Sequence, residues 1–198
     1  MNGRSNRGGT VSDQRADALE AVRNRRSHSS VTEEGPSSAE LAELVAALSS
    51  VADHSGLRPW RLIELRGDDR DAIATGLAAA DGGGEKELEK YTKKARRAPL
   101  VLAIVVKPRP SGKVPVWEQE AVASGVAHLL SLLLHEAGWG VIWRTGTLTR
   151  TEPVHRAHRL APDEYLLGWL YVGGIPEKDR KQKPRKPLRV DEVLGGLG

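Results

Sequence analysis

The segment 25–30 is rich in groups that could bind a small molecule. It reads Arg-Arg-Ser-His-Ser-Ser, with two guanidinium groups and three hydroxyls in six consecutive residues. Such donors suit a phosphate or a polyol. The alternative is a helix C-terminus that carries cations because the helix dipole favours them there. The local pattern alone favours this second interpretation.

A second polar segment, Arg144-Thr145-Gly146-Thr147, directly follows the short apolar run Val141–Trp143. The run is predicted to be a strand, and the polar segment a loop at its end. A strand that ends in Trp-Arg-Thr-Gly is suited to hold a flat cofactor. We expect the rest of the chain to be organised around the stretch 113–149, which contains this strand and this loop.

A long apolar helix is predicted to precede this strand. Pro115 suits the first turn of a helix, where its missing N–H is no loss. Ala121–Leu134 contains no formally charged residue, so we expect a helix buried in the core. The run is shorter than the roughly 20 apolar residues that span a bilayer. Gly138 and Gly140 then end the helix.

The remaining chain mixes helices and strands without regular alternation, which favours an α+β fold. The apolar run Leu100–Val106 predicts a central strand covered on both faces. Gly82–Gly84 and the charged helix after them are predicted to form a mobile lid, whereas 177–189 is too rich in Pro and Lys for regular structure. Further helices are predicted at 16–25, 37–52, 70–80, 85–97 and 151–160, and further strands at 60–65 and 165–172.

Composition limits the class of protein. The 198 residues suffice for one domain, predicted at 14–198, after a Gly-, Ser- and Arg-rich flexible tail at 1–13. The absence of cysteine excludes disulfides and thiol nucleophiles, and with no apolar leader it favours a cytoplasmic location. The net charge of +4 permits anionic ligands. We expect no membrane partner.

Several catalytic classes lack their sequence signatures. The pairs His155/His158 and His128/His135 have no obvious third ligand and no HExxH pattern, so no metal site is predicted. His128 and His135 are instead predicted to be hydrogen-bonded polar positions on the buried helix. The chain has neither the Gly-x-Ser-x-Gly motif of hydrolases nor the full glycine fingerprint of a dinucleotide site.

Four motifs in a fixed order give a more specific indication. They are Arg25-Arg26-Ser27, the segment 52–60 ending in Arg-Pro-Trp, the stretch 113–149 with its Trp-Glu-Gln-Glu helix, and Lys-Pro-Arg-Lys-Pro-Leu at 183–188. In this order, and over about 18–193, the sequence resembles the nitroreductase family of flavoproteins, in particular its small YdjA-like branch.

The resemblance implies a central, mostly antiparallel sheet with helices on both faces and a long buried central helix. It also implies a homodimer with FMN at the interface. The implied activity is that of an FMN-dependent NAD(P)H oxidoreductase: NADH or NADPH reduces FMN, which passes electrons to a nitroaromatic, quinone or related acceptor in a ping-pong mechanism. The cofactor itself carries the chemistry, so no catalytic side chain is implied.

The same resemblance assigns cofactor-binding residues by motif. Those that contact the phosphate and ribityl oxygens are Arg25, Arg26, Ser27, Lys183 and Arg185. Those that line the flavin within the same chain are Trp143, Arg144 and Thr145. His54 and Arg58 approach from the second subunit.

Two departures from the family pattern keep other functions open. Ser29 stands where many members have Lys or Arg, and His54 and Arg58 stand where other branches use Asn and Gln. The first departure motivates a non-catalytic flavin- or nucleotide-binding sensor or carrier. A nucleic-acid-binding module using 178–189 is the third alternative, but its seven Lys and Arg residues have no aromatic between them for base stacking, so no nucleic-acid partner is expected.

Overall fold

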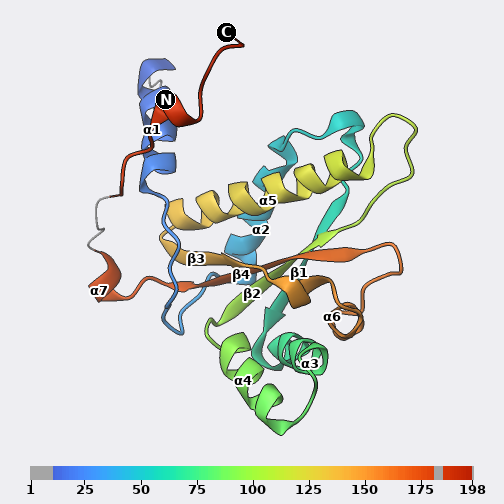
Figure 1. Cartoon of the computed structure of the whole chain (residues 1–198). Coiled ribbons are helices and arrows are strands. Elements are labelled where there is room, and N and C mark those ends of the chain that lie inside the picture. Colours follow the sequence, from blue (N-terminus) through green and yellow to red (C-terminus); the bar gives the residue numbers. More distant parts are fainter. Residues whose placement is uncertain (1–10, 181–184, 198) are drawn as a thin grey trace, which may run out of the picture.

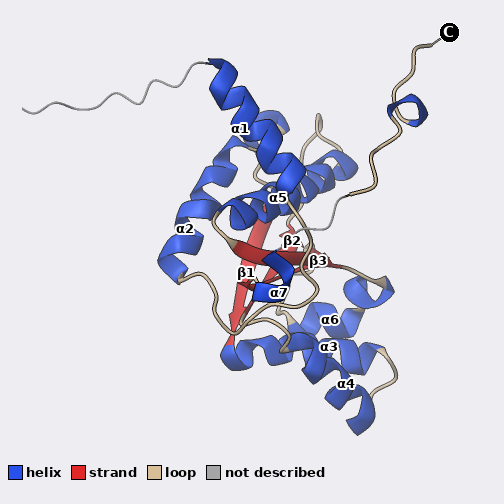
Figure 2. Ribbon diagram, turned by 90° about the vertical axis from the view of Figure 1, so that its left-hand side faces the viewer, coloured by secondary structure: helices blue, strands red, loops and turns tan. Residues whose placement is uncertain are grey.

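The computed structural model describes residues 11–180 and 185–197. Its centre is a four-stranded antiparallel sheet of order β1-β2-β4-β3, covered by helices on both faces (Figure 1, Figure 2). The strands are β1 (Trp60–Arg66), β2 (Leu100–Val106), β3 (Trp139–Arg144) and β4 (Tyr165–Gly174). The α+β prediction, with its antiparallel central sheet, is confirmed.

Strand β2 explains how one sheet supports two cores. All seven of its residues are buried, and successive side chains point to opposite faces. Leu102 and Ile104 join the core under α2 (Ser38–Ala47) and α5 (Val116–Glu136). Ala103 and Val105 join the core on the opposite face. The helices of that second face are α3 (Asp71–Ala80), α4 (Glu85–Ala95) and α6 (Glu152–Ala157).

Helix α5 is buried along one side, not all round as the apolar sequence predicted. Val126 and Leu130 are inaccessible, whereas Trp117 is 71% exposed and His128 is also exposed. The sheet covers one face of the helix, and α2, the segment Leu48–Ser50 and α1 contact parts of it, but these described elements leave Trp117 and His128 exposed. Gly138, with φ 88°, ends α5 as predicted.

The shorter helices show where local chemistry was decisive. Ser37 and Glu40 have the spacing of a capping box, and both of its hydrogen bonds are present at the start of α2, within the helix predicted at 37–52. Threonine is a residue type expected to cap a helix, but the hydroxyl of Thr151, which precedes α6, donates to the Leu148 carbonyl and does not cap that helix. Helix α7 (Glu177–Arg180) is a single turn at the start of the segment 177–189, which was predicted to be irregular; Pro176 precedes this turn and needs no N–H there. Residues 185–189 have no regular structure, as predicted.

Helix α1 differs from the prediction in its bounds, and helix α4 packs through only a few residues. Helix α1 spans Val11–Asn24, so it takes in the last residues of the predicted tail. Helix α4 packs through Tyr91 and Ala95, whereas Leu88, the one leucine of this charged helix, is 44% exposed. No helix within 11–180 and 185–197 is long and apolar enough to cross a membrane.

Candidate functional site

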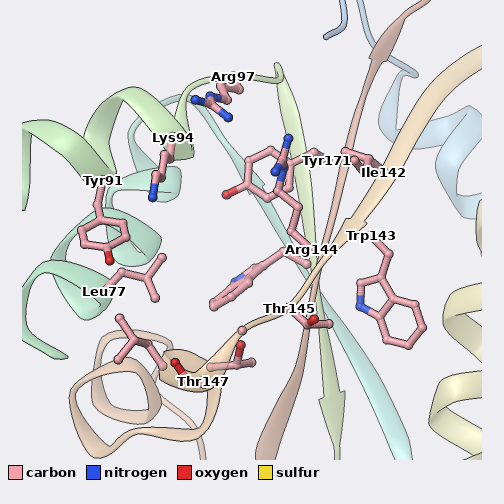
Figure 3. A pocket seen from close by; sticks show the side chains of 14 residues that line it. Leu77, Tyr91, Lys94, Arg97, Ile142, Trp143, Arg144, Thr145, Thr147 and Tyr171 are labelled. Carbon is pink, nitrogen blue, oxygen red and sulfur yellow. The ribbon is translucent and has the colours of Figure 1, made fainter. Parts of the chain in front are cut away.

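A pocket of about 460 Å³ lies between α4 and the end of β3 (Figure 3). One wall comes from α4 and the turn that follows it, with Tyr91, Lys94 and Arg97. The opposite wall comes from β3 and its following loop, including Arg144 and Thr145. A volume of this size suits a small organic molecule.

The backbone of β4 allows the Arg144–Thr145 turn to lie where it does. A Cβ at Gly168 would stand 2.3 Å from the Arg144 carbonyl oxygen and 2.9 Å from Thr145 Cγ2. With φ 131°, Gly168 also has a backbone conformation that other residues rarely adopt. This glycine therefore brings the polar loop close against β4.

Strand alternation sends Trp143 and Arg144 to opposite faces of the sheet. The Arg144 guanidinium lies over the Tyr171 ring, 5.6 Å from its centroid, on the pocket side. The Trp143 indole points away from the pocket, toward α5, and meets His128 edge-on with ring centroids 5.2 Å apart. Of these two predicted flavin neighbours, Arg144 is the one whose side chain enters the pocket.

The pocket is positively charged and incompletely hydrogen-bonded. No Asp or Glu is among the described residues that line it. Arg144 Nε and Thr149 Oγ1 are buried without a hydrogen-bond partner in the described chain. Burial raises the pKa of Tyr171 to about 12, although Arg144 and Arg97 act in the opposite direction, so its phenol stays protonated and can donate. The pocket thus offers donors and positive charge to a ligand that accepts hydrogen bonds.

A second group of cations forms around the predicted phosphate loop. The Arg185 guanidinium donates to the carbonyl of Arg25. Burial, followed by the charges of Arg185 and Arg26, lowers the pKa of Arg25. The structure therefore brings together side chains from both ends of the sequence, as predicted. Lys183 lies outside the described residues.

Arg26 also fulfils the alternative interpretation of this segment. Its guanidinium donates to the carbonyls of Arg23 at 2.7 Å, Asn24 at 3.2 Å and Arg25 at 3.1 Å. These contacts satisfy carbonyls at the C-terminus of α1. Arg26 thus closes the helix, and Arg25 is the residue left to face a ligand.

Backbone pairing fixes this loop beside the sheet. The His28 amide donates to the Val141 carbonyl of β3 at 3.0 Å, and the Thr32 amide donates to the Gly174 carbonyl of β4 at 2.8 Å. The approach is so close that a Cβ at Gly173 would lie 2.7 Å from the Thr32 carbonyl oxygen. The loop contact at Val141 is three residues from Arg144, which is about 10 Å along a strand.

The histidines of this region differ from their prediction. His28 and His135 stack with ring centroids 6.0 Å apart. His28 Nε2 and His135 Nδ1 are buried and lack hydrogen-bond partners among the described residues, so His135 is not the fully satisfied position expected. His128 is exposed. The rings pack because the loop crosses the last turn of α5, and the packing shields them from water.

The last predicted pair, His54 and Arg58, lies at the opposite end of α5. His54 Nδ1 is 2.8 Å from Glu118 Oε1 in the first turn of that helix. Asp53 shapes the loop by accepting the Arg58 amide at 2.7 Å. The cationic group around Arg25 instead lies beside His135 in the last turn. A single chain does not bring these two groups together.

Lys94 and Arg97 were missed by sequence reasoning. They belong to a run of five residues with four cations, 93–97, which indicates a solvent-exposed helix face. Only their position opposite β3 shows that they line a pocket. The spacing of Tyr91 and Lys94, three residues apart, was the available signal, because it places an aromatic ring and a cation on one side of a helix.

An antiparallel α+β fold with a cationic pocket at a strand end defines a small-molecule-binding protein. Its family follows from comparison with known proteins: the pattern of the nitroreductase family matches residues 22–174. The chain belongs to the nitroreductase family and is an oxidoreductase.

Individual relatives agree with this assignment. The "Putative NAD(P)H nitroreductase YdjA" of Escherichia coli (strain K12) is 33% identical over 160 residues, which cover 79% of this chain and 87% of that protein. A Haemophilus influenzae protein described as a "Putative NAD(P)H nitroreductase" is 27% identical, covering 84% and 92%.

Solved structures show the same fold at lower identity. The nitroreductase-like family protein from Bacillus cereus superimposes with a TM-score of 0.76 at 19% identity, covering 90% of this chain and 95% of that one. The FMN and NADPH-dependent nitroreductase NfnB from Sphigopyxis sp. strain HMH gives a TM-score of 0.73 at 19% identity, covering 91% and 99%.

Proposed function

We propose that this protein is an FMN-dependent NAD(P)H oxidoreductase that passes electrons to nitroaromatic, quinone or related acceptors by a ping-pong mechanism. Relatives carry names such as "Putative NAD(P)H nitroreductase YdjA", and one structural neighbour is described as an FMN and NADPH-dependent nitroreductase. One observation carries the proposal. In the described chain, a pocket without acidic residues and with unpaired hydrogen-bond donors lies at the end of β3, and a separate cationic loop contacts the same strand.

The donor set fits FMN from end to end. FMN joins a flat ring to a phosphate through a polyol chain, so it needs a ring site and an anion site a short distance apart. The pocket supplies the first, and Arg25 with Arg185 supplies the second. The loop contact on β3 lies about 10 Å from Arg144. When bound there, FMN would supply the group that accepts and returns a hydride.

The side chains of the pocket have defined tasks in this proposal. Lys94 and Arg144 place positive charge where a reduced cofactor ring becomes more negative. They compensate from α4 and β3 for the absence of a basic residue at Ser29. This weakens the case for a non-catalytic sensor or carrier, which rested on Ser29. Tyr171 remains protonated and donates a hydrogen bond.

We further propose a homodimer. Glu118, which contacts His54, and His135, which lies near Arg25, are 17 residues apart on α5. At 1.5 Å per residue this is about 26 Å. His54 and Arg58 can therefore reach a cofactor held by Arg25 only from another copy.

Uncovered apolar residues support such a dimer. Trp117 and Val116 are exposed on α5. The C-terminal segment extends away from the body of the chain (Figure 2) and exposes Leu188, Val190, Val193, Leu194 and Leu197. Exposed apolar surface of this kind marks interaction sites.

The test uses the purified chain of 198 residues. We expect it to be yellow and to release FMN on denaturation. We also expect it to oxidise NADH or NADPH steadily when a nitroaromatic or quinone is present. The balanced reaction with a nitro group consumes one NAD(P)H and one proton and yields a nitroso group, NAD(P)⁺ and water. A colourless protein that cannot be reconstituted with FMN would refute the proposal, and a yellow protein without turnover would favour the sensor or carrier.

A further inference from the structure

We propose that the pocket selects electron acceptors that carry a negative charge, namely aromatic compounds with a carboxylate or sulfonate group. This inference rests on the proposed function, because it names the class of acceptor that the same pocket takes. Its basis is the arrangement of three cations, Lys94, Arg97 and Arg144, around the pocket.

The pocket contains more positive charge than its own residues neutralise. Within the described chain, the Lys94 ammonium contacts the Tyr91 ring, 4.7 Å from the centroid, and the Arg144 guanidinium contacts the Tyr171 ring. The Arg97 guanidinium has no hydrogen bond or ion pair to a described residue, and no carboxylate of the described chain lines the pocket. Ring contacts weaken a cation's field much less than a carboxylate does, so this charge stays available to a ligand.

The neighbouring residue Arg96, in contrast, is neutralised by carboxylates. Its guanidinium contacts Asp68 Oδ1 at 3.2 Å and Asp71 Oδ1 at 3.0 Å, and it does not line the pocket. Arg96 and Arg97 are thus consecutive residues of one type, of which one is ion-paired on the surface and the other faces the pocket. This pair allows a matched experiment.

The position of the cations matches two ligands in one pocket. Arg144 lies on the β3 wall, where the flavin ring is proposed to lie, whereas Lys94 and Arg97 lie on the α4 side across the cavity (Figure 3). Aromatic rings from Tyr91, Trp169 and Tyr171 also line the pocket. A flat aromatic acceptor can pack there with its anionic substituent toward Arg97, which is exposed at the rim.

The experiment compares two acceptors that differ in charge, 4-nitrobenzoate and methyl 4-nitrobenzoate. The readout is the ratio of their kcat/KM values in the FMN-loaded wild type, Arg97→Gln and Arg96→Gln at low ionic strength. Dividing the carboxylate-to-ester ratio of each variant by that of the wild type cancels the different intrinsic reactivities of the two compounds. We expect Arg97→Gln to lower the carboxylate-to-ester ratio about fivefold, as one partly exposed charge pair allows, and Arg96→Gln to leave it unchanged.

The outcomes separate this inference from the proposed function. A fall of the wild-type carboxylate-to-ester ratio in added salt would support the inference, because screening weakens an interaction between exposed charges. An unchanged ratio in Arg97→Gln would overturn it, even if the enzyme turns over both compounds. A raised KM for NADPH with an unchanged ratio would also overturn it and assign Arg97 to the nucleotide donor. Absence of turnover in the wild type with both nitro compounds and with a quinone would instead refute the proposed NAD(P)H oxidoreductase activity.

Discussion

Arg25 differs from its neighbour Arg26 because its guanidinium has no carbonyl to bind within the described chain. Arg26 closes α1, and Arg25 stands beside Arg185 with its pKa lowered. An anion would relieve this crowding of like charges. We therefore predict that Arg25→Ala weakens FMN binding by about 1.5–3 kcal/mol, or roughly 10–150-fold in Kd. Titration of the apoprotein with FMN, followed by fluorescence, measures the change. Arg23→Ala, on the exposed side of α1, is the control, and equal affinities would remove Arg25 from the site.

Glu164 is the clearest case of a single side chain that stabilises the fold. It is 4% exposed, and it accepts from Arg61 at 2.8 and 2.6 Å and from the Ala161 amide at 3.0 Å. The Arg61 hydrogen bonds are the main reason that its pKa falls to about 2, with smaller contributions from Ala161 and Lys107 that help to outweigh desolvation. The carboxylate thereby ties β1 to the start of β4.

We predict that Glu164→Gln lowers the free energy of unfolding by about 1–3 kcal/mol at pH 7. The lower part of this range applies if solvent at the partly exposed Arg61 screens the pair. Because the folded pKa is depressed, the stabilisation is complete above pH 4.5 and is lost as the pH falls toward 2. The difference in the free energy of unfolding between Glu164→Gln and wild type, measured with urea, should be smaller at pH 3 than at pH 7. Glu43→Gln, on the exposed surface of α2, should change little at either pH.

At the scale of elements, the proposed phosphate-binding loop is joined to α5 through the stacked imidazoles of His28 and His135. Burial lowers the pKa of both His28 and His135, and the neighbouring charges of Arg25 and Arg26 add to the effect. Asp179 near His28, and Glu136 and the Asn24 backbone near His135, act in the opposite direction without cancelling it. Protonation would therefore place charge in a shielded contact that already faces two arginines.

This contact predicts a loss of stability in mild acid. The unfolded chain protonates histidine near pH 6.5 while the folded protein keeps these rings neutral, so unfolding takes up protons and stability falls as the pH drops below about 6.5. Replacing His135 with Phe keeps a ring in place but removes one titrating group. Urea unfolding at pH 7.5 and pH 5 should show a smaller decrease for His135→Phe than for wild type. The same decrease in both proteins would contradict the prediction, and His128→Phe on the exposed side of α5 serves as the control.

Local patterns predicted most elements because they act within a few residues. The capping box at Ser37, the apolar run of β2 and the glycine after α5 each determine a structure on their own. The pocket depends on contacts between residues about 50 positions apart, such as Lys94 opposite Arg144, and no local pattern contains them. The motif order indicated the β3 loop and Arg25, whereas the α4 wall became visible only in the folded chain.

At the scale of the whole molecule, the unequal burial of α5 is the feature that one chain leaves unexplained. Ala121–Leu134 carries no formal charge, yet part of this helix is open, and Trp117 in its first turn is 71% exposed. A largely apolar helix with an open face is stable in water when a second copy covers that face. The same dimer would carry His54 and Arg58 to the cofactor of the partner.

We predict that the FMN-loaded protein has twice the 21.5 kDa mass of the chain, as measured by light scattering after gel filtration. Trp117→Glu places a charge on the open face of α5 and should shift the protein toward monomer. Because His54 and Arg58 then no longer reach the partner, FMN retention should fall with dimer content as the protein is diluted. Leu88→Glu is the matched control, since Leu88 is an exposed apolar residue on α4, away from that face. A wild-type monomer that retains FMN fully would show that one chain completes the site and that the open face of α5 has another role.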